Sequence, residues 1–178
     1  ESYGFLIGDL VRDKDAVVSC AFIAEMTAFY KDQGITLYEA MLNMYQQYGL
    51  YKETLVSITK KGKAGAEAIN NMMHGFRTNP PTTLGGSPVV ALKDYTTGEE
   101  KDIVTGKVSK LNFPKSDVLQ FVTSDGSTIS ARPSGTEPKI KFYCSVKTTL
   151  TDTAKFKQLD EGLTVKIDSI MNDLGVEA

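Results

Sequence analysis

Three short segments of alternating polarity in the second half of the chain constrain the fold more than any other feature. Residues 118–123, 127–132 and 139–146 alternate apolar and polar side chains, which is the period of a half-buried β-strand. The first two segments are separated by Ser124, Asp125 and Gly126, and an Asp-Gly pair favours a tight turn because glycine readily takes a positive φ. The pattern predicts antiparallel strands with one buried face.

Helical periodicity precedes and follows these strands. It predicts helices over residues 13–34 and 36–49, a third over 64–76 that ends before the Pro80-Pro81 pair, and a long final helix over about 153–174. Thr36 and Glu39 have the spacing of a capping box at the start of the second helix. Two more β-rich segments, 54–59 and 89–92, predict further strands.

The change of period near residue 50 predicts a domain boundary. Residues 1–50 carry only the two helical patterns, whereas residues 51–178 carry all the predicted strands and two helices. We therefore expect an α+β fold for residues 51–178, with an antiparallel sheet and its helices packed on one face.

Composition excludes several classes of function. The formal net charge is -2, with 20 basic and 22 acidic residues interspersed, so we expect no nucleic-acid partner. No apolar run approaches the roughly 20 residues that span a bilayer, and we expect no membrane association. One histidine and two cysteines are too few for a usual zinc site. We expect Cys20 and Cys144 to be buried, unpaired thiols, which favours a cytoplasmic protein.

The loop between the second and third predicted strands concentrates groups that bind anions. The guanidinium of Arg132 can hold two phosphate oxygens, Gly135 can expose backbone N–H groups, and Ser134 and Thr136 add hydroxyls. Lys139 adds positive charge at the end of the loop. The alternative is a rigid turn in which the hydroxyls bond their own backbone and Arg132 pairs with Glu137.

The same segment, "RPSGTEPKIKFY" at residues 132–143, closely resembles the phosphate-binding loop in the C-terminal domain of the α-D-phosphohexomutases, the phosphoglucomutase and phosphomannomutase family, and within it the bacterial phosphoglucomutase-like group. A second segment, "ESYGFLIGDLVRDKDAV" at residues 1–17, resembles the sugar-recognition loop of the same family. The spacing of the two segments also fits, so the resemblance covers essentially the whole chain.

The resemblance implies an incomplete enzyme. Residues 1–50 correspond to the end of the third domain, an α/β domain, and residues 51–178 to the fourth domain, which binds phosphate. The family's catalytic phosphoserine loop and its Mg²⁺ loop have no counterpart here. We therefore expect no catalytic residue and no metal ligand in this chain, and a full-length protein whose missing N-terminal domains hold both.

The resemblance also assigns roles to individual residues. The phosphate of a hexose phosphate is expected to bind Arg132, Ser134, Gly135, Thr136 and Lys139. The sugar is expected to contact Glu1, Ser2 and Lys14.

The leading hypothesis is a part of a phosphohexomutase that interconverts hexose 1-phosphate and hexose 6-phosphate, inactive by itself. The alternatives are a stand-alone module that binds sugar phosphates or anions without catalysis, and a structural α+β interaction domain. Preference among glucose, mannose, ribose and glucosamine stays open at this point.

Overall fold

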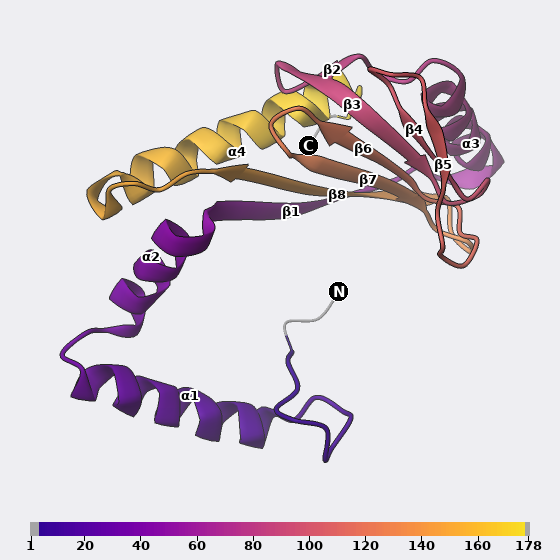
Figure 1. Ribbon diagram of the computed structural model, residues 1–178. Helices are drawn as coiled ribbons and strands as arrows, with labels where there is room; N and C mark the ends of the chain where they lie inside the picture. The colour runs from indigo at the N-terminus through magenta and orange to yellow at the C-terminus, as the bar shows by residue number, and fades with distance from the viewer. Residues whose placement is uncertain (1–3, 177–178) are drawn as a thin grey trace. The chain divides into compact units, whose positions relative to one another are not determined.

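The computed structural model describes residues 4–176. The chain forms two compact units, one up to Tyr48 and the other from Gly49 onward (Figure 1). None of the helices in this described part is long and apolar enough to cross a membrane.

The first unit contains two helices, α1 (Ala16–Asp32) and α2 (Leu37–Tyr48). The side chain of Asp15 caps α1 by accepting hydrogen bonds from the amides of Val17 at 2.7 Å and Val18 at 3.4 Å. The predicted capping box of α2 is confirmed. The amide of Thr36 donates to Glu39 Oε2 at 2.7 Å, and the amide of Glu39 donates to Thr36 Oγ1 at 3.2 Å.

The prediction that both thiols are buried is wrong for Cys20. This thiol is exposed, and so are most of the apolar side chains of α1, none of which is buried. The helical period therefore identified the helix correctly but not its environment, because burial needs a packing partner as well as an apolar face. Cys144, in the second unit, is buried and unpaired as expected.

The second unit is built on an eight-stranded sheet. Seven strands follow the order β1-β8-β7-β6-β3-β4-β5, and β2 pairs with β3. The strands are β1 (Leu50–Thr59), β2 (Thr83–Leu84), β3 (Ser87–Asp94), β4 (Glu99–Asp102), β5 (Val108–Lys110), β6 (Leu119–Thr123), β7 (Thr128–Pro133) and β8 (Lys139–Thr148).

All strand pairs in this sheet are antiparallel, which confirms the predicted α+β class. The three alternating segments predicted as strands are β6, β7 and β8, and Gly126 lies in the turn between the first two with φ 80°. The strands β2, β4 and β5 were not predicted. They are short, and β4 and β5 carry mostly charged and polar residues, so they lack the alternation that marks a half-buried strand.

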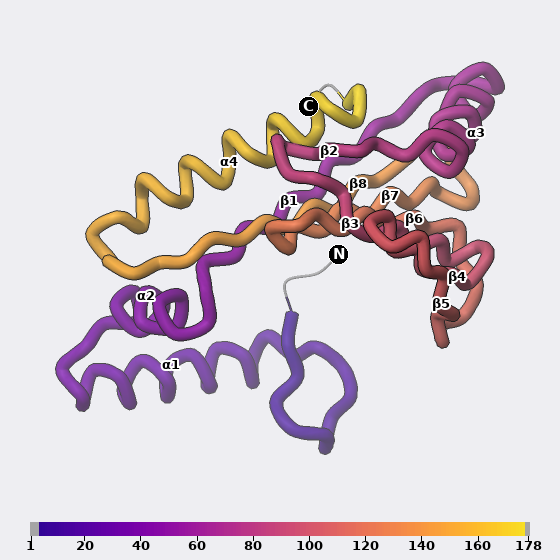
Figure 2. The backbone as a smooth tube through the Cα atoms, turned by 45° about the horizontal axis from the view of Figure 1, so that its top comes forward, coloured from indigo at the N-terminus to yellow at the C-terminus, as the bar shows by residue number. Residues whose placement is uncertain are grey.

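The core lies on one face of the sheet, under the helices α3 (Gly62–Thr78) and α4 (Phe156–Asp173), the latter preceded by the 3₁₀ turn Thr153–Lys155. Figure 2 shows both helices on the same side of the strands, as predicted. Phe76 of α3 packs edge-on against Phe121 and Phe142, with ring centroids 5.7 and 6.4 Å away. The fully or nearly fully buried apolar residues of β6, β7 and β8 are Leu119, Phe121, Ile129, Ala131, Ile140, Phe142, Cys144 and Val146.

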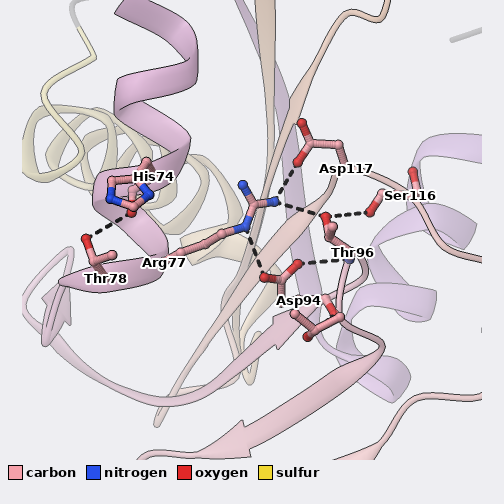
Figure 3. A network of polar contacts seen from close by, with 8 residues as sticks. His74, Arg77, Thr78, Asp94, Thr96, Ser116 and Asp117 are labelled. Atoms are coloured by element: carbon pink, nitrogen blue, oxygen red, sulfur yellow. Dashed lines mark hydrogen bonds and ion pairs between the residues drawn. The ribbon is translucent and has the colours of Figure 1, made fainter.

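A cluster of polar contacts joins the end of α3 to the sheet (Figure 3). The guanidinium of Arg77 contacts Asp94 at 3.0 Å, Thr96 at 3.1 Å and Asp117 at 2.5 Å. Asp94 ends β3 and Asp117 precedes β6, so one side chain ties together both ends of the segment that carries β4 and β5.

Candidate functional site

The anion-binding segment forms the loop of the β7–β8 hairpin. Arg132 and Pro133 are the last residues of β7 and lie opposite Lys141 and Ile140 of β8. Beyond this register, the amide of Ser134 donates to the carbonyl of Lys139 at 2.7 Å and closes the base of the loop. Residues 135–138 therefore project from a rigid ladder, which fixes where their polar groups are offered.

Inside the loop, Ser134 Oγ is an acceptor. It receives the amides of Glu137 at 3.2 Å and Thr136 at 3.4 Å, while the amide of Lys139 donates to the carbonyl of Glu137 at 2.7 Å. A hydroxyl that accepts in this way can still donate its own hydrogen. The amide of Gly135 has no hydrogen-bond partner among residues 4–176, so it too remains available as a donor.

Arg132 is exposed, and its side chain makes no hydrogen bond or ion pair with any described residue. In particular, it does not pair with Glu137. The alternative of a rigid turn predicted two things. Its hydroxyl-to-backbone bonds are present at Ser134, but its ion pair between Arg132 and Glu137 is not. An arginine without a partner at the base of an exposed loop can accept an anion without first breaking an ion pair.

Gly135 does not adopt the backbone conformation for which a turn most often needs glycine. Its φ is not positive, and a Cβ atom at this position would meet nothing within 4 Å. The turn is achieved by the hydrogen bonds of Ser134 and Lys139 instead, so loop geometry does not by itself require glycine here.

A basic segment that the sequence analysis missed lies beside the loop. The amide of Lys60, which follows the last residue of β1, donates to the carbonyl of Pro138 at 2.8 Å. Lys60 is followed in the sequence by Lys61 and Lys63. The signal was present in the sequence as a "KKGK" run, but its relevance depended on β1 pairing with β8 about 80 residues further along the chain.

The predicted sugar-binding residues belong to the first unit. Glu1 and Ser2 lie outside the described residues. Lys14 lies two residues before α1, and its aliphatic stem packs against the backbone of Gly4, where an added Cβ would come within 2.3 Å of Lys14 Cδ.

The described residues do not fit a metal site. Within residues 4–176, no group of three His, Cys, Asp or Glu side chains could hold an ion together. The carboxylate of Asp125, in the only Asp-Gly pair of the sequence, is occupied by Lys166 and by the hydroxyls of Ser87, Thr123 and Ser127. It has little capacity left for a divalent cation.

Comparison with known proteins assigns the chain to a family. Residues 88–162 match the family model for the phosphoglucomutase/phosphomannomutase C-terminal domain. Over 147 residues the chain is 44% identical to a phosphoglucomutase of Staphylococcus aureus (strain bovine RF122 / ET3-1), an alignment that covers 83% of the chain and 26% of the relative. The chain belongs to this phosphohexomutase family. It represents a C-terminal part, which confirms the resemblance seen in the sequence.

Two further likenesses agree with this assignment. A phosphoglucomutase of Staphylococcus saprophyticus is 36% identical over 147 residues, again 83% of the chain and 26% of the relative. The phosphohexomutase chain therefore spans about a quarter of the length of the curated relatives it matches. The open-form crystal structure of pp63/parafusin, a phosphoglucomutase from Paramecium, superposes with a TM-score of 0.50 over 93% of this chain and 29% of that one. At 21% identity, this second likeness concerns the fold alone.

The candidate loop lies within the matched C-terminal domain, since residues 132–139 fall inside the range 88–162. The lysines at positions 60, 61 and 63 precede that range.

Proposed function

We propose that this chain is the phosphate-binding part of a phosphoglucomutase or phosphomannomutase that interconverts hexose 1-phosphate and hexose 6-phosphate. The observation that carries the proposal is Arg132, which stands exposed and unpaired at the base of a loop with free donors, inside the matched domain. The relatives that resemble the chain over most of its length are named phosphoglucomutases.

In this proposal the loop holds the phosphate that is not being transferred. Arg132 supplies charge and a planar pair of donors, which suit two phosphate oxygens. The Ser134 and Thr136 hydroxyls and the Gly135 amide donate to the remaining oxygens, and Lys139 adds positive charge at the start of β8. Because Gly135 needs no special backbone conformation, its value here is the open space that lets an oxygen approach the amide.

The groups that bind the sugar, transfer the phosphoryl group and hold Mg²⁺ lie outside the loop in this proposal. We propose that Glu1, Ser2 and Lys14 contact the sugar. The phosphoserine and the ligands of Mg²⁺ would be supplied by the family's N-terminal domains, because the described residues do not fit a metal. The bound Mg²⁺ would stabilise charge on the phosphoryl group being transferred. Two unpaired cysteines fit a cytoplasmic location.

The test is a titration of the 178-residue chain with inorganic phosphate and with glucose 1-phosphate, followed by amide NMR shifts. We expect the shifts to concentrate at residues 132–139. Arg132→Ala should weaken binding about tenfold to a hundredfold, because charge-assisted hydrogen bonds contribute roughly 1.5–3 kcal/mol each. Arg132→Lys should restore part of the loss, since an ammonium cannot form two parallel bonds.

The matched control is Lys110→Ala, which removes one exposed positive charge from β5, at the opposite end of the sheet order from β1. It should leave both titrations unchanged. If saturating phosphate or glucose 1-phosphate leaves the amide shifts of residues 132–139 unchanged, the loop is a structural turn and the proposal fails.

The chain alone should have no mutase activity, because it has no counterpart of the phosphoserine loop. Turnover of glucose 1-phosphate by the purified chain that disappears in Arg132→Ala would contradict this expectation.

A further inference from the structure

A glycine of α3 packs against the residue whose amide bonds the end of the candidate loop. Gly65 is buried in the first part of this helix, and its Cα lies directly against the backbone of Lys60. A Cβ added to Gly65 would lie 2.1 Å from the carbonyl oxygen of Lys60 and 2.4 Å from its carbonyl carbon. Real Cβ atoms do not approach backbone so closely, so any larger residue would push Lys60 and α3 apart.

Lys60 is in turn bonded to the loop. Thr59 and Lys139 are the last paired residues of the β1–β8 ladder, and the Lys60 amide extends that ladder by one bond to Pro138 O, at 2.8 Å. Pro138 is the residue before β8, where the loop ends. Gly65, Lys60 and Pro138 thus form a continuous backbone connection between a helix and the anion-binding segment.

Other helical glycines in this unit show that the contact is specific. A Cβ added at Gly75, later in α3, or at Gly162, in α4, would meet nothing within 4 Å. Alanine at these positions would favour the helix, since glycine is the poorer helix former by roughly 1 kcal/mol. At Gly65 this gain is opposed by the collision with Lys60.

We propose that Gly65 is a positioning residue for phosphate binding. By letting α3 pack directly on Lys60, it holds the Lys60 amide where it can bond Pro138, and so fixes the end of the loop that presents Ser134, Gly135 and Thr136. Gly65 does not touch the ligand. The inference rests on the proposed function of the loop. It assigns control of the loop geometry to a residue that lies about 70 positions before the loop in the sequence.

The experiment compares Gly65→Ala with Gly75→Ala in the 178-residue chain, using inorganic phosphate as the probe. In Gly65→Ala we expect faster exchange of the Lys60 amide, displaced amide shifts in residues 134–139, and phosphate binding weakened about three- to tenfold, the effect of losing roughly one hydrogen bond. Gly75→Ala should bind phosphate as the parent does.

A second pair of variants tests the same connection if Gly65→Ala does not fold. Lys60→Pro removes both the amide hydrogen and the ammonium, whereas Lys60→Ala removes the ammonium alone. If the backbone bond positions the loop, Lys60→Pro should weaken phosphate binding clearly more than Lys60→Ala. Equal binding by these two folded variants would overturn the proposal.

The outcomes separate the two proposals. If Arg132→Ala loses phosphate binding while folded Gly65→Ala keeps the affinity of the parent, the loop binds phosphate but Gly65 does not position it. If the parent chain shows no phosphate-dependent shift at residues 132–139, the proposed function fails and the role of Gly65 fails with it.

Discussion

The Nζ atom of Lys166 in α4 lies 2.5 Å from Oδ2 of Asp125 in the turn between β6 and β7, and this ion pair joins the long helix to the sheet. The same carboxylate accepts hydrogen bonds from the hydroxyls of Ser87, Thr123 and Ser127. Partial burial opposes the ionised form, but these bonds outweigh it and hold the pKa of Asp125 well below its usual range.

Replacement of Asp125 by Asn should destabilise the second unit. The variant loses the ion pair with Lys166 and weakens the bonds to the surrounding hydroxyls, so we expect a loss of about 2–3 kcal/mol in the free energy of unfolding, measured with urea. Asp160→Asn is the matched control, because it breaks the Lys52–Asp160 pair, in which the aspartate side chain is 38% exposed. That change should cost about 0.5–1 kcal/mol. Equal losses would contradict a special role for Asp125.

The lowered pKa of Asp125 also predicts how stability depends on pH. In the unfolded chain Asp125 takes up a proton near its usual pKa of about 4, whereas in the folded chain it stays ionised to lower pH. Its contribution is therefore fully present above about pH 5 and is lost as the pH falls through the folded pKa. The difference in unfolding free energy between the parent and Asp125→Asn should shrink steadily below about pH 4. A constant difference from neutral to acidic pH would rule out this assignment.

Arg77 should be irreplaceable by lysine. Burial lowers the pKa of its guanidinium, but the bonds to Asp117 and Asp94 more than compensate and raise it, so the group stays charged. A single ammonium cannot contact both carboxylates in the same geometry. We expect Arg77→Lys to cost about 1–2 kcal/mol and to speed amide exchange across residues 95–116.

The control for Arg77 is Lys93→Ala, which removes the longer Lys93–Glu100 contact of 3.8 Å in the same region. It should change exchange in residues 95–116 far less than Arg77→Lys does. Similar exchange rates in the two variants would show that Arg77 does not hold this segment.

The capping box of α2 provides a prediction for the first unit. Thr36→Ala removes the hydroxyl that accepts the Glu39 amide, so the amides of the first turn of α2 should exchange about fivefold faster, the effect expected for an N-cap side chain. Thr27→Ala is the control, because the Thr27 hydroxyl only bonds the Ile23 carbonyl within α1. Unchanged exchange in Thr36→Ala would mean that the box does not stabilise α2.

The sequence predicted the elements whose side chains repeat with a clear period. Buried and less buried side chains alternate along the core strands β6, β7 and β8, and α3 and α4 have apolar stripes. Both patterns arise because one face of the sheet is buried against one face of each helix. The start of β1, residues 50–53, was missed, whereas its end at Thr59 was predicted. Its pattern of alternate half-buried residues from Tyr51 onward is weak, and β1 is held mainly by pairing with β8.

For the candidate site, the sequence by itself determined the residue types of the loop, its position between two strands and its resemblance to the phosphohexomutases. The identities of Arg132, Ser134 and Thr136 are local, so a motif is enough to find them. The tertiary structure decided that Arg132 has no ion-pair partner in the described chain, that Ser134 closes the loop, and that Lys60, against which Gly65 packs, bonds the end of the loop. The bond between Lys60 and Pro138 joins segments about 80 residues apart, and no periodicity within a short segment can encode which distant backbone will meet it.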